Sequence, residues 1–108
     1  MKMYDVIFDQ DAEDDLFDIY AFVALNDSVE NADRLFAALC RTCLRLRKLP
    51  LCGTISKELF EIGLTEFREL HDKPYRFIYS LESTTVNVHC VVDGRRDIQD
   101  FIQERLMQ

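Results

Sequence analysis

The sequence predicts an α+β fold in which two helices form a hairpin on one face of a small antiparallel sheet. Apolar residues recur at helical spacing between residues 11 and 49, and this spacing changes to strict alternation after Gly53. The three glycines and two prolines fall between the predicted elements. A chain of 108 residues is long enough for one core, so residues 1–108 are expected to form a single domain with the order β-α-α-β-β-β-α.

The first strand is predicted at residues 3–8, where Tyr4, Val6 and Phe8 alternate onto one face. A helix is predicted from about Asp11 to Leu25. Its apolar stripe consists of Ala12, Leu16, Ile19 and Val23, and the acids Asp11, Asp14, Asp15 and Asp18 are expected on the opposite side.

A second helix is predicted from about Val29 to Leu49, because Asp27 and Glu30 form a capping-box-like start and Pro50 stops it. A short connection joins the two helices, so they should be antiparallel. Ala32, Leu35, Phe36, Leu39, Cys43 and Leu46 share the apolar face, and Arg34, Arg41, Arg45 and Lys48 form a basic stripe opposite it. That stripe either contacts a target or an acidic antagonist, or pairs with the acids of the first helix.

Three alternating segments, residues 65–71, 75–81 and 86–92, predict a meander of antiparallel strands with turns at residues 72–74 and 82–84. Ile98, Phe101, Ile102 and Leu106 then predict a short helix over residues 96–106.

The net charge of −7 argues against a general affinity for nucleic acid, because phosphate contacts need Lys and Arg. The charge is segregated, however: residues 1–33 hold ten acids and one base, whereas residues 34–48 hold five bases and no acid. No apolar run is long enough for a membrane span, and the N-terminus lacks the apolar segment of a signal peptide, so the cytoplasm is expected.

The four cysteines are expected to be free thiols in a reducing compartment. The Cys40-x-x-Cys43 pair lies inside a predicted helix, and Cys52 and Cys90 do not form a second close pair. A structural zinc site usually needs two close pairs, so neither a metal nor another cofactor is predicted.

Several short motifs follow one another along nearly the whole chain. They are Ala12-x-x-Asp15-Leu16-x-x-Ile19, Leu46-x-x-Leu49-Pro50, Lys57-Glu58-Leu59, Phe67-Arg68-Glu69-Leu70, Tyr75-Arg76-Phe77-Ile78-Tyr79 and Val91-Val92-Asp93-Gly94-Arg95-Arg96-Asp97. In this order and spacing the chain resembles the RelE/ParE superfamily of toxins from type II toxin–antitoxin systems, which includes plasmid stabilisation proteins. The resemblance implies the β-α-α-β-β-β fold and a cognate antitoxin whose flexible segment wraps the toxin, often within a hetero-oligomer.

The resemblance implies one of two activities. ParE-like members inhibit DNA gyrase by protein–protein binding, which would make Arg76, Arg95, Arg96 and Asp97 the target-binding residues. RelE-like members are ribosome-dependent, metal-independent endoribonucleases that cut mRNA, which would make Arg68, His71, Arg76 and Arg96 the catalytic candidates. Cleavage by 2′-OH attack needs a base, cations for the charged phosphorane and an acid for the leaving oxygen.

The ParE-like activity is the favoured interpretation, and whether the chain is an enzyme stays open. The tyrosine of RelE-like sites has no match, because Phe101 and Ile102 occupy the comparable positions. His71 is the remaining candidate base. Arg76 either points at a partner or pairs with Glu66, Glu69 or Asp97. A degenerate toxin without activity is a third interpretation.

Overall fold

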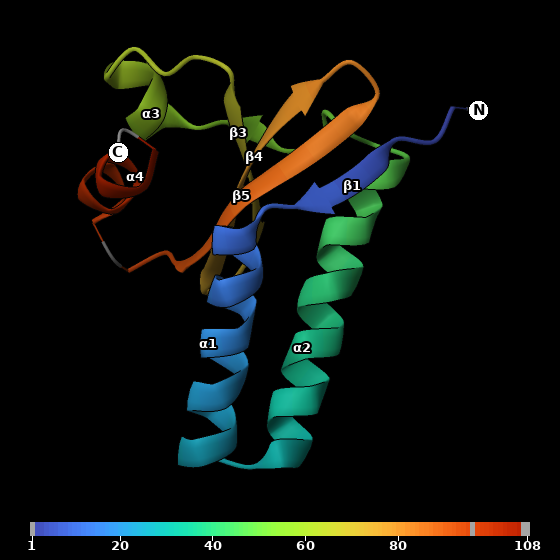
Figure 1. Cartoon of the computed structure of the whole chain (residues 1–108), viewed down its shortest axis with the longest axis vertical. Coiled ribbons are helices and arrows are strands. Elements are labelled where there is room, and N and C mark those ends of the chain that lie inside the picture. The colour runs from blue at the N-terminus through green and yellow to red at the C-terminus, as the bar shows by residue number, and fades with distance from the viewer. Residues whose placement is uncertain (1, 96, 107–108) are drawn as a thin grey trace.

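The computed structural model describes residues 2–95 and 97–106 and shows a five-stranded sheet with helices on both faces. A hairpin of α1 (Gln10–Asn26) and α2 (Val29–Leu44) covers one face. Two shorter helices, α3 (Lys57–Glu61) and α4 (Ile98–Leu106), cover part of the other face. Figure 1 shows the hairpin extending well beyond the sheet, with α3 and α4 gathered beside the sheet. The predicted α+β class and helical hairpin are confirmed.

The sheet has the order β1-β5-β4-β3-β2. Its strands are β1 (Asp5–Phe8), β2 (Thr54–Ile55), β3 (Phe67–Asp72), β4 (Tyr75–Glu82) and β5 (Thr85–Asp93). β3, β4 and β5 form the predicted antiparallel meander. β1 instead pairs with β5 in parallel, so the expectation of an entirely antiparallel sheet was wrong. The connection from β1 to β5 runs through the whole hairpin and meander, and parallel pairing needs a long connection of this kind.

Polar caps define the start of both long helices. Asp9 accepts a hydrogen bond from the backbone N–H of Ala12, and Ser28 accepts one from Asn31, each at 3.0 Å. α2 ends at Leu44 and continues as the 3₁₀-helix η1 (Arg45–Arg47), so the predicted single helix to Leu49 is divided.

The hairpin packs on the sheet through the predicted stripes with two exceptions. Phe36, expected in the core, is exposed, whereas Asp15, expected on the solvent side, is largely buried. Asp15 is buried because it accepts the N–H of Val91 on β5 at 2.9 Å and pairs with Arg105 on α4. The core on this face contains Ala12, Leu16, Leu39, Cys43, Leu46, Leu70, Phe77, Tyr79, Val86, Val88 and Val91.

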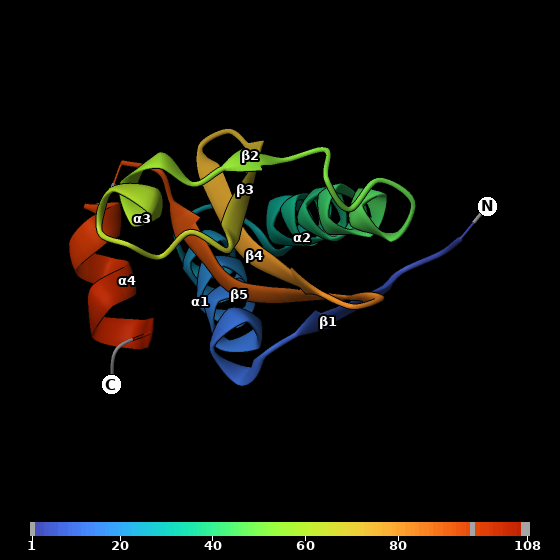
Figure 2. The ribbon, with the colours of Figure 1, turned by 90° about the horizontal axis from the view of Figure 1, so that it is seen from above.

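A second core lies between the sheet and the two short helices. Figure 2 shows α3 and α4 close to each other in the view from above. It consists of Leu59, Phe67, Ile78, Cys90, Val92, Ile98 and Ile102. The short elements β2 and α3 were not predicted, because two and five residues are too few for a periodic signal. None of the described helices is long and apolar enough to cross a membrane.

A β-bulge in β5 determines which side chains share the face with this second core. Ile78 pairs with Cys90 and Tyr79 with Val88, so His89 is the extra residue on β5. Val88 faces the hairpin, whereas the bulge places both His89 and Cys90 on the side of the second core. The His89 ring meets the Phe67 ring edge-on, with 5.3 Å between the ring centroids.

Candidate functional site

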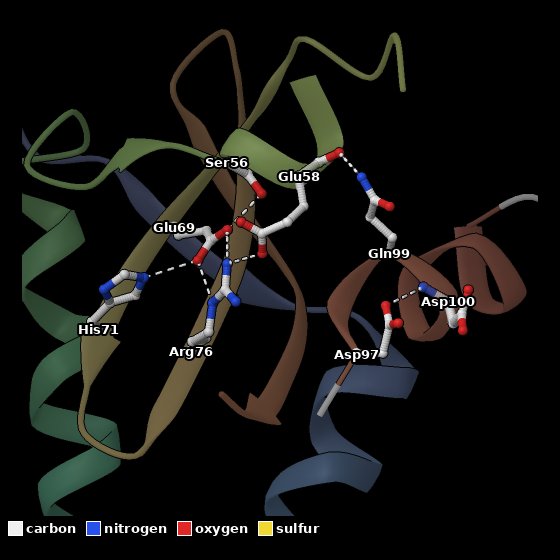
Figure 3. A network of polar contacts seen from close by, with 8 residues as sticks. All are labelled: Ser56, Glu58, Glu69, His71, Arg76, Asp97, Gln99 and Asp100. Carbon is white, nitrogen blue, oxygen red and sulfur yellow. Dashed lines mark hydrogen bonds and ion pairs between the residues drawn. The ribbon is translucent and has the colours of Figure 1, made fainter. Parts of the chain in front are cut away.

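Arg76 stands between two carboxylates where β3, β4 and α3 meet (Figure 3). Its Nε donates to Glu69 Oε1 at 2.6 Å, and its Nη2 reaches Glu69 Oε2 and Glu58 Oε2, each at 2.5 Å. Pairing with Glu69 was one of the alternatives that the sequence left open, whereas Glu58 was not foreseen as a partner. The guanidinium is therefore directed into the protein rather than toward solvent.

Glu69 is the buried centre of this cluster, with only 3% of its side chain exposed. It accepts hydrogen bonds from Ser56 Oγ at 2.6 Å and from Arg76, and it contacts His71 Nε2 at 2.9 Å. Burial alone would raise the pKa of Glu69, but the hydrogen bonds from Arg76, Ser56 and His71 outweigh burial and lower it. Glu69 is thus held as a carboxylate.

His71 is the accessible member of the cluster, because 54% of its side chain is exposed while Glu69 holds its Nε2. The geometry resembles that of an oriented base, as the sequence interpretation required. With a neutral imidazole, however, Glu58 and Glu69 outnumber the single guanidinium. A group that stabilises a phosphorane must supply an excess of positive charge, and this cluster does not.

The nuclease candidates are not brought together. Arg68 alternates onto the opposite face of β3, where its Nη2 donates to the carbonyl oxygens of Gly53 at 3.0 Å and Leu51 at 3.4 Å. Arg68 therefore stabilises the loop before β2, on the other side of the sheet from His71 and Arg76. Arg96 is outside the described residues.

The turn after β5 lies against the Arg76 side chain. A Cβ at Gly94 would come within 3.0 Å of Arg76 Cδ and of the Pro74 carbonyl oxygen, so only glycine fits without a shift. Arg95 extends from this turn with 81% of its side chain exposed, although Nη2 contacts Asp93 at 2.5 Å. Asp97 accepts the N–H of Asp100 at 3.2 Å and so caps the start of α4.

Three of the predicted target-binding residues therefore lie in one region with distinct roles. Arg76 is bound by carboxylates behind the turn, Arg95 is presented to solvent, and Asp97 supports a helix end. Ser56 and Glu58 belong to the Glu69–Arg76 cluster, but the sequence did not indicate them. Glu58 lies in the Lys57-Glu58-Leu59 motif, to which no role was assigned.

The hairpin carries an exposed apolar surface at its far end. Leu25 is 85% exposed, and Phe17, Phe22 and Val29 are each more than half exposed. Beside this surface, a groove of about 370 Å³ lies between α1, the end of β5 and α4. Its lining includes Asp15, Asp18, Ile19, Phe22, Tyr75, Val91, Val92, Asp93, Arg95 and Phe101.

The basic stripe of α2 and η1 does not pair with α1. Arg34, Arg41, Arg45 and Lys48 are exposed, and no ion pair joins them to another described residue. A hydrogen bond from Tyr20 to Asp33, at 2.6 Å, connects the helices instead. Of the alternatives that the sequence left open for this stripe, pairing with the acids of α1 is therefore wrong, and the four cations are accessible.

One family model matches the chain in sequence, and two solved structures share its fold. The family model for the ParE toxin of the type II toxin–antitoxin system parDE matches residues 6–98. A structure of the chromosomal ParDE system from P. aeruginosa superimposes with a TM-score of 0.69 at 15% identity, covering 84% of this chain and 96% of that one. The toxin–antitoxin complex RelBE2 from Mycobacterium tuberculosis superimposes with a TM-score of 0.65 at 23% identity, covering 86% and 93%. No curated protein sequence matches the chain.

Proposed function

The chain belongs to the ParE toxin family of type II toxin–antitoxin systems, and from this premise we propose that it inhibits DNA gyrase by protein–protein binding. A cognate antitoxin neutralises it, and the pair would serve plasmid stabilisation or an equivalent role. The proposed action needs no metal or organic cofactor. It takes place in the cytoplasm, where gyrase works.

One observation carries the choice of gyrase over mRNA cleavage. Arg76, the strand arginine that a RelE-like site would need, is neutralised by Glu58 and Glu69. A phosphate approaching this cluster would meet two carboxylates. The repulsion between these carboxylates and the phosphate, together with the loss of their hydration, would cost more free energy than the attraction of one guanidinium contributes. Phe101 also stands where a proton-donating tyrosine would be required.

The surfaces suited to a protein target are different from this cluster. Arg95 has 81% of its side chain exposed, and Arg96 and Asp97 follow it in sequence. Exposed apolar side chains such as Phe22 lie on the neighbouring surface of α1. Large apolar groups beside arginine are typical of protein-binding surfaces. We propose that Arg76 positions the turn from behind, and that Arg95 and Arg96 contact the target.

An antitoxin partner is supported by the two similar structures, which are those of a ParDE system and of a RelBE2 toxin–antitoxin complex. We propose that a flexible antitoxin segment covers exposed apolar residues of the hairpin and forms a hetero-oligomer with the toxin. The exposed basic stripe on α2 would suit acidic residues of that segment.

The rival function is ribosome-dependent mRNA cleavage, and one observation favours it. His71 presents an accessible imidazole that a buried carboxylate orients. If it acted as a base, the phosphorane would need cations from outside the Glu58–Glu69–Arg76 cluster.

Expression without antitoxin separates the two functions. Plasmid supercoiling and full-length transcripts should be followed over the first minutes after induction, and purified toxin should be assayed with purified gyrase. Gyrase inhibition predicts altered supercoiling while early transcripts remain whole. Arg95→Glu should weaken inhibition, whereas Lys57→Ala, at an exposed position on α3, should not. Transcripts cut within codons before any change in supercoiling would overturn the proposal, as would normal growth of cells that contain folded toxin.

A further inference from the structure

The sheet face that carries the second core continues beyond α3 and α4 into an open polar region. By register, Ile7, Asn87, Ser80 and Phe67 stand side by side across β1, β5, β4 and β3. Ile7 is exposed, while Ser80 and Asn87 are partly exposed. Phe67 is buried in the second core, but reagents in solution can reach the row from Ile7 to Ser80, which the proposed inhibitory function does not use.

Ser80, His89 and Asp9 form a linear hydrogen-bonded chain in this region. Ser80 Oγ lies 2.7 Å from His89 Nε2, and His89 Nδ1 lies 3.1 Å from Asp9 Oδ2. The three residues come from β4, the bulge of β5 and the loop between β1 and α1. A hydroxyl on Nε2 and a carboxylate on Nδ1 are the arrangement that activates serine in acyl-transfer enzymes.

The hydrogen bonds define the direction in which a proton would move. A carboxylate can only accept, so Asp9 holds a proton on His89 Nδ1, which in a neutral imidazole is the tautomer with Nε2 unprotonated. Nε2 is then an acceptor, and Ser80 must donate to it. Asp9 is itself fixed, because its other oxygen caps α1 through the N–H of Ala12. His89 is thus oriented by Asp9, a residue that also caps α1.

The surroundings indicate what could react at Ser80. Asn87 is directly opposite Ser80, at a spacing where Cβ atoms are about 5 Å apart, and a carboxamide is a group that can donate to a developing oxyanion. The exposed Ile7 offers an apolar contact in the same row. The nearby acids Asp5, Asp9 and Glu82 disfavour anionic substrates.

We propose that Ser80 is a nucleophile, with His89 as its base and Asp9 as its positioning residue, toward small uncharged acyl esters. In the first step Oγ bonds to the acyl carbon, His89 Nε2 takes the hydroxyl proton, and the ester C–O bond breaks. The leaving alkoxide receives that proton. Water then attacks the acyl–Ser80 ester, Nε2 takes a proton from the water, and the proton returns to Oγ as the carboxylic acid leaves.

The test uses a fluorophosphonate ester as a covalent probe and p-nitrophenyl acetate as a substrate, with the full chain. Peptide mass spectrometry should locate the phosphonyl group on Ser80 and leave Ser83, an exposed serine in the next turn, unmodified. Ser80→Ala should abolish labelling. Ser83→Asn, which suits the positive φ of 56° at that position, should label like the natural chain.

Two further variants distinguish a reactive serine from a merely structural contact. Asp9→Asn keeps an oxygen for the α1 cap but presents an amide N–H to Nδ1, which forces the proton onto Nε2. His89→Gln removes the base. Each should slow labelling by about 10²-fold or more while thermal unfolding shows a folded chain. Labelling of Ser80 no faster than Ser83, or unchanged in Asp9→Asn and His89→Gln, would overturn the proposal.

Discussion

Replacing Arg76 by Met should destabilise the fold strongly, because it leaves Glu69 buried with only Ser56 and His71 as partners. Methionine preserves the aliphatic volume against Gly94 but removes the charge and three hydrogen bonds. Removing one partner of a buried ion pair costs about 3–5 kcal/mol. Glu58 is one-third exposed and contributes little, since water replaces its lost partner. Domains of this size have a total stability of about 5–15 kcal/mol, so the loss is a large fraction.

Urea denaturation should give this free energy of unfolding from the midpoint and slope of the transition. Adding Glu69→Gln to Arg76→Met should restore much of the loss, because the unpaired charge is then gone. The double-mutant cycle isolates the interaction of the two side chains. If Arg76→Met unfolds within about 1 kcal/mol of the natural chain, the pair behaves like a surface ion pair, and our account of the cluster is wrong.

The pH dependence provides a second check on the same cluster. Because the folded-state pKa of Glu69 is lowered from 4.5, its contribution is fully present above that value and is lost as pH falls through the lower folded-state pKa. In Arg76→Met the main cause of this lowering is removed, and burial should raise the pKa instead. The stability deficit of the variant should therefore shrink as pH falls from 7 toward 4.

Three further predictions concern parts of the chain outside this cluster. Ser28→Ala should cost about 1 kcal/mol in urea denaturation and Ser28→Asn much less, because only alanine removes the α2 cap. Iodoacetamide at pH 8 should alkylate the exposed Cys52 well before Cys43, since burial raises the pKa of Cys43 to about 12; equal rates by mass spectrometry would contradict this. Asp15→Ala should cost about 1.5–3 kcal/mol and speed amide exchange in α4, because Arg105 loses the carboxylate that joins α4 to α1; unchanged exchange would show that α4 is held by its apolar face alone.

The sequence predicted the elements that have a long periodic signal. The stripe of Ala12, Leu16 and Ile19 and the alternation through β4 are set by local chemistry, so both were recognisable. The alternation predicted through β5 was wrong beyond Val88, because the bulge places Cys90 on the opposite face of the sheet. The parallel direction of β1 was not recognisable, because the alternation of residues 3–8 is the same in a parallel and in an antiparallel strand. Asp15 was predicted on the wrong side of the helix because it lies at the margin of the apolar stripe of α1. Its burial depends on an ion pair with Arg105, which is 90 residues away in the sequence.

The candidate site was only partly predictable for the same reason. His71, Glu69 and Arg76 belong to neighbouring strands, and their proximity follows from the predicted meander. Glu58 enters from a five-residue helix that periodicity does not detect. The Ser80–His89–Asp9 chain depends on a bulge and on residues 80 positions apart, which no local pattern reveals.

The parallel pairing of β1 with β5 also affects how the protein is made. Asp5 is synthesised 80 residues before its partner Thr85. At about 5–20 residues per second, the ribosome needs several seconds to synthesise the stretch between them. During that interval β1 and the sheet-facing side of α1 have no strand to cover them, so the sheet is completed only after β5 has been synthesised. For those seconds the nascent chain exposes the apolar side of α1 that β5 later covers.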